Sequence, residues 1–68
     1  MGAGGIINDV HEKIADLLPL VMKPRFYPTN SGARDRLEMI NSRGAAQGTQ
    51  DDLEFLGRLV SEATRPPE

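Results

Sequence analysis

The chain has 68 residues and a net charge of −2, with no cysteine, no tryptophan and one histidine. A chain this short forms one domain with a small core, and without cysteine it has neither a disulfide nor a thiolate metal site. Tight helix packing, oligomerisation or a bound partner must then supply its stability. So small a domain also leaves little room for a substrate pocket, which argues against an enzyme.

The first predicted element is an amphipathic helix from about residue 6 to residue 22. The glycine-rich start, residues 1–5, is predicted to be flexible because glycine loses much backbone entropy on ordering. Pro19 would clash with the carbonyl of Ala15, so the helix either kinks there or stops and restarts. The apolar residues recur at helical spacing on one arc. They are Ile6, Ile7, Val10, Ile14, Leu17, Leu18 and Val21.

Residues 23–30, KPRFYPTN, are predicted to be an irregular connection. Its two prolines favour turn or extended geometry. A connector does not require aromatic residues, so Phe26 is expected to turn inward and close the open end of a helical bundle. Arginine and tyrosine are enriched at binding hot spots, and prolines reduce the cost of ordering a loop on binding. Arg25, Phe26 and Tyr27 are therefore candidate partner-binding residues.

A second, weaker helix is predicted over residues 31–43. Thr29, Asn30 and Ser31 are all suitable residue types for its N-cap, and Gly44 is a common helix terminator. Its apolar stripe is narrow, and Met39 lies off it. The stripe consists of Ala33, Leu37 and Ile40. The following GAAQG stretch, residues 44–48, is predicted to be a loop.

A third helix is predicted over residues 49–64, with a flexible tail at 65–68. Thr49 followed by Asp52 is an aspartate variant of the capping box. Phe55 and Leu59 widen the apolar face beyond one stripe. Either this helix packs against both of the others, or these two residues form a second interface with a partner or another copy. The expected face without them is Leu53, Leu56, Val60 and Ala63.

These elements predict an all-α fold, a small three-helix bundle in a single domain over residues 6–64, which dimerisation could complete. Short connections favour antiparallel neighbours.

The charges are unevenly distributed, with a basic middle segment between acidic ends. The opposite charges either face each other in the folded chain or leave an exposed basic patch. A patch would allow nucleic-acid binding, with Phe26 or Tyr27 stacking on bases. Acidic residues at the start of the third helix would repel phosphates, so that helix is not expected to read DNA. The possible nucleic-acid contacts beyond Arg25 are Lys23, Arg34, Arg36 and Arg43.

No stretch carries a catalytic, metal or cofactor signature. His11 would need a second ligand four residues later to form a zinc helix, and that position is Ala15. Glu12 and Asp16 lie on a solvated helix face, where no pocket would shift their pKa values. We therefore expect no catalytic residue, no metal and no cofactor.

The sequence as a whole favours a non-enzymatic module that binds another protein as an adaptor, inhibitor or assembly factor. Self-association is also expected, whereas a membrane or a small-molecule substrate is not. Nucleic-acid binding through residues 23–43 and a structural role in a phage-like particle are the alternatives. The N-terminus lacks signal-peptide features, which favours the cytoplasm. Arginine outnumbers lysine, as in GC-rich bacterial or phage genomes.

Overall fold

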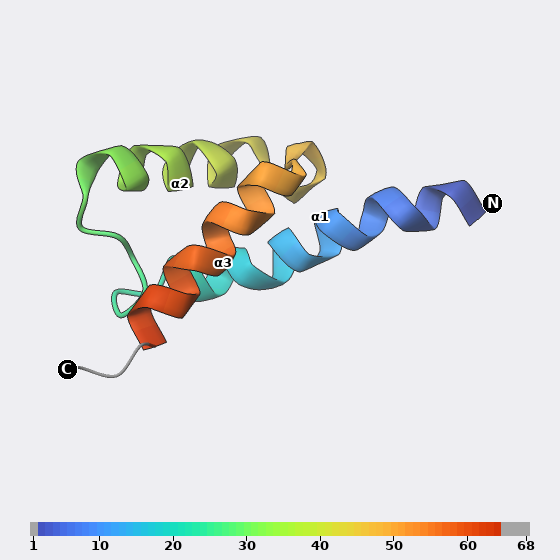
Figure 1. Cartoon of the computed structure of the whole chain (residues 1–68). Coiled ribbons are helices and arrows are strands. Elements are labelled where there is room, and N and C mark those ends of the chain that lie inside the picture. The colour runs from blue at the N-terminus through green and yellow to red at the C-terminus, as the bar shows by residue number, and fades with distance from the viewer. Residues whose placement is uncertain (1, 65–68) are drawn as a thin grey trace.

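The chain folds into a three-helix bundle, as the sequence predicts (Figure 1). The computed structural model describes the backbone of residues 2–64 and the side chains of residues 9–64, so the predicted tail at 65–68 lies outside the described residues. The described backbone contains no strand. Its elements are α1 (Gly2–Val21), α2 (Ser31–Arg43), the short 3₁₀ helix η1 (Ala45–Gln47) and α3 (Gln50–Thr64).

Helix α1 differs from its predicted bounds at the start. Its helical backbone begins at Gly2 rather than at residue 6. Once the amphipathic part has formed, each further residue adds one hydrogen bond to an existing helix, which is much easier than nucleation. Pro19 lies inside α1 and does not end it. Both Pro19 and Ala15 are exposed, so water can reach the carbonyl that Pro19 leaves without a donor.

Helix α2 has the predicted bounds because both of its ends are specified by local chemistry. Of the three candidate caps, Asn30 is the one used: its side-chain oxygen accepts the N–H of Ala33 at 3.0 Å. At the other end Gly44 adopts a φ of 94°, and its N–H donates to the carbonyl of Ile40 at 3.0 Å. A residue with a Cβ is strained at that φ, which explains the glycine.

The predicted capping box begins α3. The N–H of Asp52 donates to the hydroxyl of Thr49 at 3.2 Å, and the N–H of Thr49 donates to the Asp52 carboxylate at 3.0 Å. Two N–H groups that would lack helical partners are thereby satisfied. The helix starts at Gln50, with Thr49 as its cap rather than as its first residue.

The core joins the three helices along the predicted arcs. Phe55 is one of its members and is 8% exposed, so the wide face of α3 is used within the chain. Half-buried Leu53, Leu59 and Val60 pack against its edge. The buried apolar residues are Ile14, Leu18, Val21, Leu37, Ile40, Phe55 and Leu56.

The arrangement of α2 and α3 opens the bundle at one end. The two helices lie close to each other at the η1 turn and diverge toward the connection between α1 and α2 (Figure 1). At the closed end η1 packs against α1, where a Cβ on Gly48 would lie 2.4 Å from the Cδ1 of Ile14. At the open end the connection 22–30 runs past the last turns of α3, and this end contains the candidate site.

Candidate binding groove

A turn orders the connection between α1 and α2. The carbonyl of Lys23 accepts the N–H groups of Phe26 at 3.0 Å and of Tyr27 at 2.9 Å. Pro24 occupies the second position of this turn, where its fixed φ is favourable and no N–H is needed. The segment ends at the capping residue Asn30. A proline-stiffened turn and a helix cap therefore hold the segment in place.

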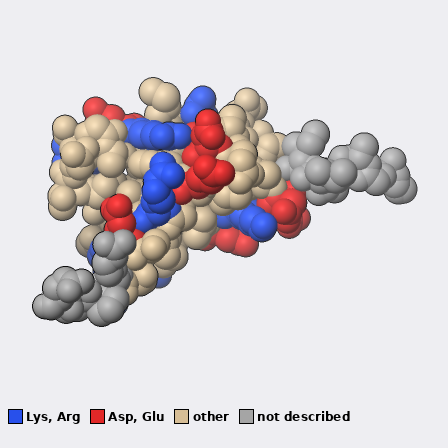
Figure 2. Space-filling model, in the orientation of Figure 1, with Lys and Arg blue, Asp and Glu red and all other residues tan. Residues whose placement is uncertain are grey.

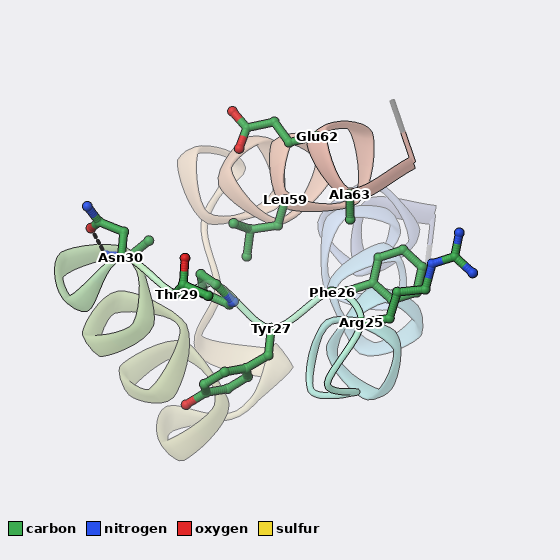
Figure 3. A pocket seen from close by; sticks show the side chains of 10 residues that line it. Arg25, Phe26, Tyr27, Thr29, Asn30, Leu59, Glu62 and Ala63 are labelled. Carbon is green, nitrogen blue, oxygen red and sulfur yellow. Dashed lines mark hydrogen bonds between the residues drawn. The ribbon is translucent and has the colours of Figure 1, made fainter. Parts of the chain in front are cut away.

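This segment forms one wall of a groove of about 290 Å³, which we call the α3 groove (Figure 3). The opposite wall comes from α3, where Leu59 and Ala63 point toward the hollow and the Glu62 side chain is directed away from it (Figure 3). Ala33 closes the side formed by α2. The groove thus has apolar groups in the middle and polar or charged groups at its margin. Its lining residues are 25–30, Ala33, Leu59, Glu62 and Ala63.

The structure brings together four of the five residues that the sequence nominated for partner binding. Arg25, Phe26 and Tyr27 lie across the groove from Leu59, more than thirty positions later in the chain. Phe26 and Tyr27 are half-buried and pack against the edge of the core, as expected for residues that close the open end.

The fifth nominated residue, Phe55, does not line the groove. It is buried in the core, and the guanidinium carbon of Arg36 lies 4.7 Å from the centre of its ring. This cation–π contact covers one face of the ring with α2. Phe55 therefore has little surface to offer a partner in this conformation.

Tyr27 is held to α2 by a hydrogen bond. Its hydroxyl donates to the carboxylate of Glu38. This bond, with smaller contributions from burial and from the negative charge of Glu38, raises the pKa of Tyr27 above its ordinary value of 10.0. The contact joins the aromatic residue of the groove wall to the middle of the next helix.

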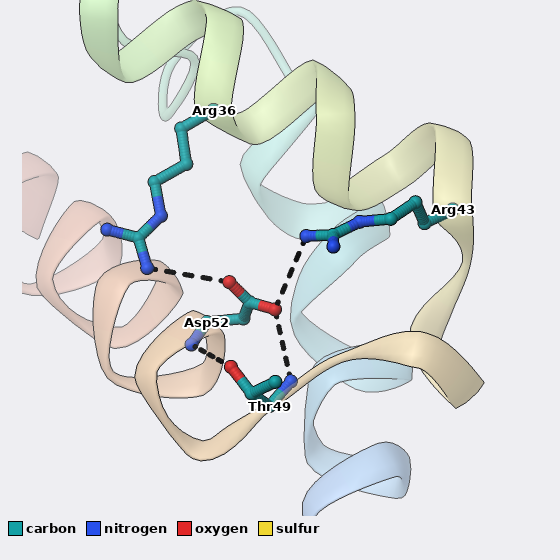
Figure 4. A network of polar contacts seen from close by, with 4 residues as sticks. All are labelled: Arg36, Arg43, Thr49 and Asp52. Atoms are coloured by element: carbon teal, nitrogen blue, oxygen red, sulfur yellow. Dashed lines mark hydrogen bonds and ion pairs between the residues drawn. The ribbon is translucent and has the colours of Figure 1, made fainter.

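Two of the five middle basic residues face α3 rather than forming a common patch (Figure 4). Arg36 Nη2 lies 3.4 Å from Asp52 Oδ1, and Arg43 Nη2 lies 3.7 Å from Asp52 Oδ2. Burial by itself would raise the pKa of the Asp52 carboxyl. The hydrogen bonds from Thr49 and Arg36, with the charge of Arg43, outweigh it and lower that pKa. The expectation that opposite charges face each other therefore applies to Arg36 and Arg43.

The described basic residues do not gather in one patch on the surface. Basic and acidic groups lie interspersed on the visible face of α2 and α3, without a continuous basic region (Figure 2). Lys23, Arg25 and Arg34 are also exposed, and they lie on or beside the connection between α1 and α2. The five residues considered for nucleic-acid contact are thus split between two places.

In the described part of the chain, no group of three or more histidine, aspartate or glutamate side chains is placed to hold a metal ion. His11 is half-buried on α1 and is not among the residues that line the α3 groove. Among the described helices, none combines the length and apolar character needed to cross a bilayer.

Sequence reasoning missed several groove residues. Thr29 and Asn30 were considered only as helix caps and Ala63 only as part of a packing face, and Glu62 was not singled out. Nothing in their local sequence marks them as lining a groove, because the groove exists only where α2 and α3 diverge. A search of protein-family models, curated proteins and solved structures found no match to this chain.

Proposed function

We propose that this chain is a non-enzymatic protein–protein interaction module, acting as an adaptor, inhibitor or assembly factor, and that its partner binds in the α3 groove. The observation that carries the proposal is that Arg25, Phe26, Tyr27 and Leu59 all line one hollow. Tyrosine and arginine are enriched among residues that dominate binding energies, especially beside apolar pockets that exclude water.

The preformed shape of the groove wall supports this proposal. The turn at Lys23, the cap at Asn30 and the bond from Tyr27 to Glu38 already fix the segment. A partner then does not have to order a disordered loop, a cost that would subtract from its affinity. The polar groups of Tyr27 and Asn30 already form hydrogen bonds within the fold. This favours binding over catalysis at this site.

Protein binding is favoured over nucleic-acid binding by the charge arrangement. Arg36 and Arg43 are paired with Asp52, and Glu62 adds a negative charge to the groove margin. A phosphate backbone needs a track of available cations. A structural role in a larger assembly would use the same groove and remains within this proposal.

The proposal can be tested by filling the groove. Ala63→Phe places a ring in the groove from a position outside the core cluster. Ser61→Phe, two residues earlier on the exposed side of α3, is its matched control. Peptides would first be selected from a random library displayed on phage against the original protein. Their dissociation constants for all three proteins would then be measured by fluorescence anisotropy.

We expect Ala63→Phe to weaken binding at least about tenfold, equivalent to 1.4 kcal/mol, and Ser61→Phe to change it less than about twofold. Circular dichroism would verify that both variants stay helical. Equal affinities for the two variants would overturn the proposed site. Failure to select any specific peptide would overturn the proposed function.

A further inference from the structure

A second groove lies beside the first and shares a wall with it. It has a volume of about 510 Å³, and we call it the Met22 groove. Residues 27–29 line both grooves and form a ridge between them. The outer side of the Met22 groove is mainly apolar, with one guanidinium. Its lining residues are Met22, Pro24, Tyr27, Pro28, Thr29 and Arg34.

The ridge is fixed before any partner arrives. Tyr27 is tied to Glu38 on α2, Pro28 has a fixed φ, and Asn30 caps the helix that follows. A partner therefore meets two preformed hollows on either side of a stiff ridge. Met22, directly after α1, is one of two exposed methionines among the described residues, and flexible methionine side chains adapt well to apolar groups.

The charges around the two grooves differ. Arg34 lines the Met22 groove, and Lys23 lies between two residues that line it, Met22 and Pro24. None of the ion pairs among the described residues involves Lys23, Arg25 or Arg34, whereas Arg36 and Arg43 are paired with Asp52. The α3 groove carries Arg25 at one margin and Glu62 at another. The Met22 groove thus has one guanidinium in its lining, that of Arg34, which takes part in no ion pair among the described residues, and it has no carboxylate in its lining.

We infer that the Met22 groove binds an acidic, apolar segment of a partner protein. A large apolar side chain of that segment occupies the hollow beside Met22 and Pro24, and a neighbouring aspartate or glutamate contacts Arg34. The segment continues over the ridge into the α3 groove. Opposite charge at this rim speeds the encounter and fixes the direction in which the segment lies.

A peptide fits these observations better than a nucleic acid. The hollow is walled mainly by a methionine and two prolines, and Arg34 is the one cation in its lining that a phosphate chain could contact. Two carboxylates, Glu38 and Glu62, lie next to the ridge and the α3 groove and would repel phosphates. A segment with one or two acidic residues beside its apolar residue brings far less negative charge near these carboxylates than a polyanion does.

This inference rests on the proposed function but makes a separate claim about the partner's chemistry. Two pairs of variants test it, each with a matched control outside both grooves. Arg34→Glu is compared with Arg58→Glu, which makes the same charge change at an exposed position of α3. Met22→Ser is compared with Met39→Ser, which removes the other exposed methionine. The probe is the same phage-displayed random-peptide library, selected on the original protein and on Arg34→Glu.

We expect peptides selected on the original protein to combine aspartate or glutamate with a large apolar residue. Arg34→Glu and Met22→Ser should each weaken their binding about tenfold, and the two controls less than about twofold. The affinity for the original protein should fall with added salt, and that for Arg34→Glu much less. Selection on Arg34→Glu should instead enrich lysine or arginine.

Several results would overturn the inference. One is enrichment of peptides that lack acidic residues; another is equal effects of Arg34→Glu and Arg58→Glu. Labelled single-stranded DNA that displaces the peptide and requires Arg34 would assign the groove to nucleic acid. A dimer mass in light scattering that Met22→Ser lowers would assign it to a second copy of the chain. If Ala63→Phe weakens peptide binding but Arg34→Glu does not, the proposed function stands and only this inference fails.

Discussion

Asp52 offers the sharpest test of how the bundle is held together, because its one carboxylate joins α2 to the start of α3. It accepts the N–H of Thr49 and contacts Arg36 and Arg43, although its residue is only 5% exposed. Asp52→Ala removes all three contacts and leaves the Cβ in place. The matched control is Asp51→Ala, one residue earlier, where the side chain is exposed and only the favourable charge at the helix start is lost.

The expected loss of stability follows from the three contacts. Thr49 remains the cap in this variant, and the hydrogen bond that is lost, from the Thr49 N–H to the carboxylate, contributes about 1 kcal/mol. The two arginines are half-exposed and lie 3.4 Å and 3.7 Å from the carboxylate oxygens, so water compensates much of their loss. Each such pair contributes on the order of 0.5 kcal/mol or less. Asp52→Ala should therefore lower the free energy of unfolding by about 1 to 2 kcal/mol.

Urea unfolding followed by circular dichroism measures this difference, with the melting temperature as a second readout. For a domain of this size the loss corresponds to a fall in melting temperature on the order of 10 °C. Asp51→Ala should lose only about 0.3 to 0.5 kcal/mol. Equal losses for the two variants would refute the account of Asp52 as the residue that joins α2 to the start of α3.

The pH dependence supplies an independent check of the same contact. The fold lowers the pKa of Asp52 below its ordinary value of 3.8, so the unfolded chain binds a proton more readily than the folded chain. The stabilisation is therefore fully present above that ordinary value and is lost as the pH falls through the lower value of the folded state. The stability difference between the original protein and Asp52→Ala should shrink below pH 3.8. A constant difference would contradict the lowered pKa.

Two further substitutions test the closed end of the bundle and the ridge. Gly48→Ala should destabilise the fold by about 1 kcal/mol or more in urea unfolding, because its Cβ would lie 2.4 Å from the Cδ1 of buried Ile14. Gly57→Ala has open space around it on α3, so it should stabilise the fold by about 0.5 to 1 kcal/mol. The opposite order of stabilities would contradict the packing of η1 on α1. Tyr27 is the only tyrosine and there is no tryptophan, so its ionisation can be followed by absorbance; its midpoint should lie above 10.0 and move toward that value in Glu38→Gln. An unchanged midpoint would mean that Glu38 does not hold the ridge.

The sequence predicted the elements whose ends are encoded by neighbouring residues. The bounds of α2 follow from Asn30 and Gly44, and the start of α3 follows from the pair Thr49 and Asp52. The start of α1 could not be predicted in the same way, because a run of glycines has no cap and a weak preference. Its helical state depends on extension from the amphipathic part that follows.

The groove depended on information that the sequence does not carry locally. Phe55 and Leu59 both widened the apolar face of α3, but only the packing of three helices decides that Phe55 is buried and Leu59 lines a hollow. Charge layout predicted that basic and acidic segments could face each other. It could not show that Arg36 and Arg43 would form ion pairs with Asp52, or that Arg34 would line another groove.

The central claim is that partners bind at the two grooves on either side of residues 27–29. The most direct test is a titration of isotope-labelled protein with a selected peptide, followed by nuclear magnetic resonance of the backbone amides. The account predicts that the largest shift changes fall within residues 22–34 and 59–63. Largest changes around Met39, or along the exposed side of α1 between Asp9 and Asp16, would contradict it and place the binding surface elsewhere.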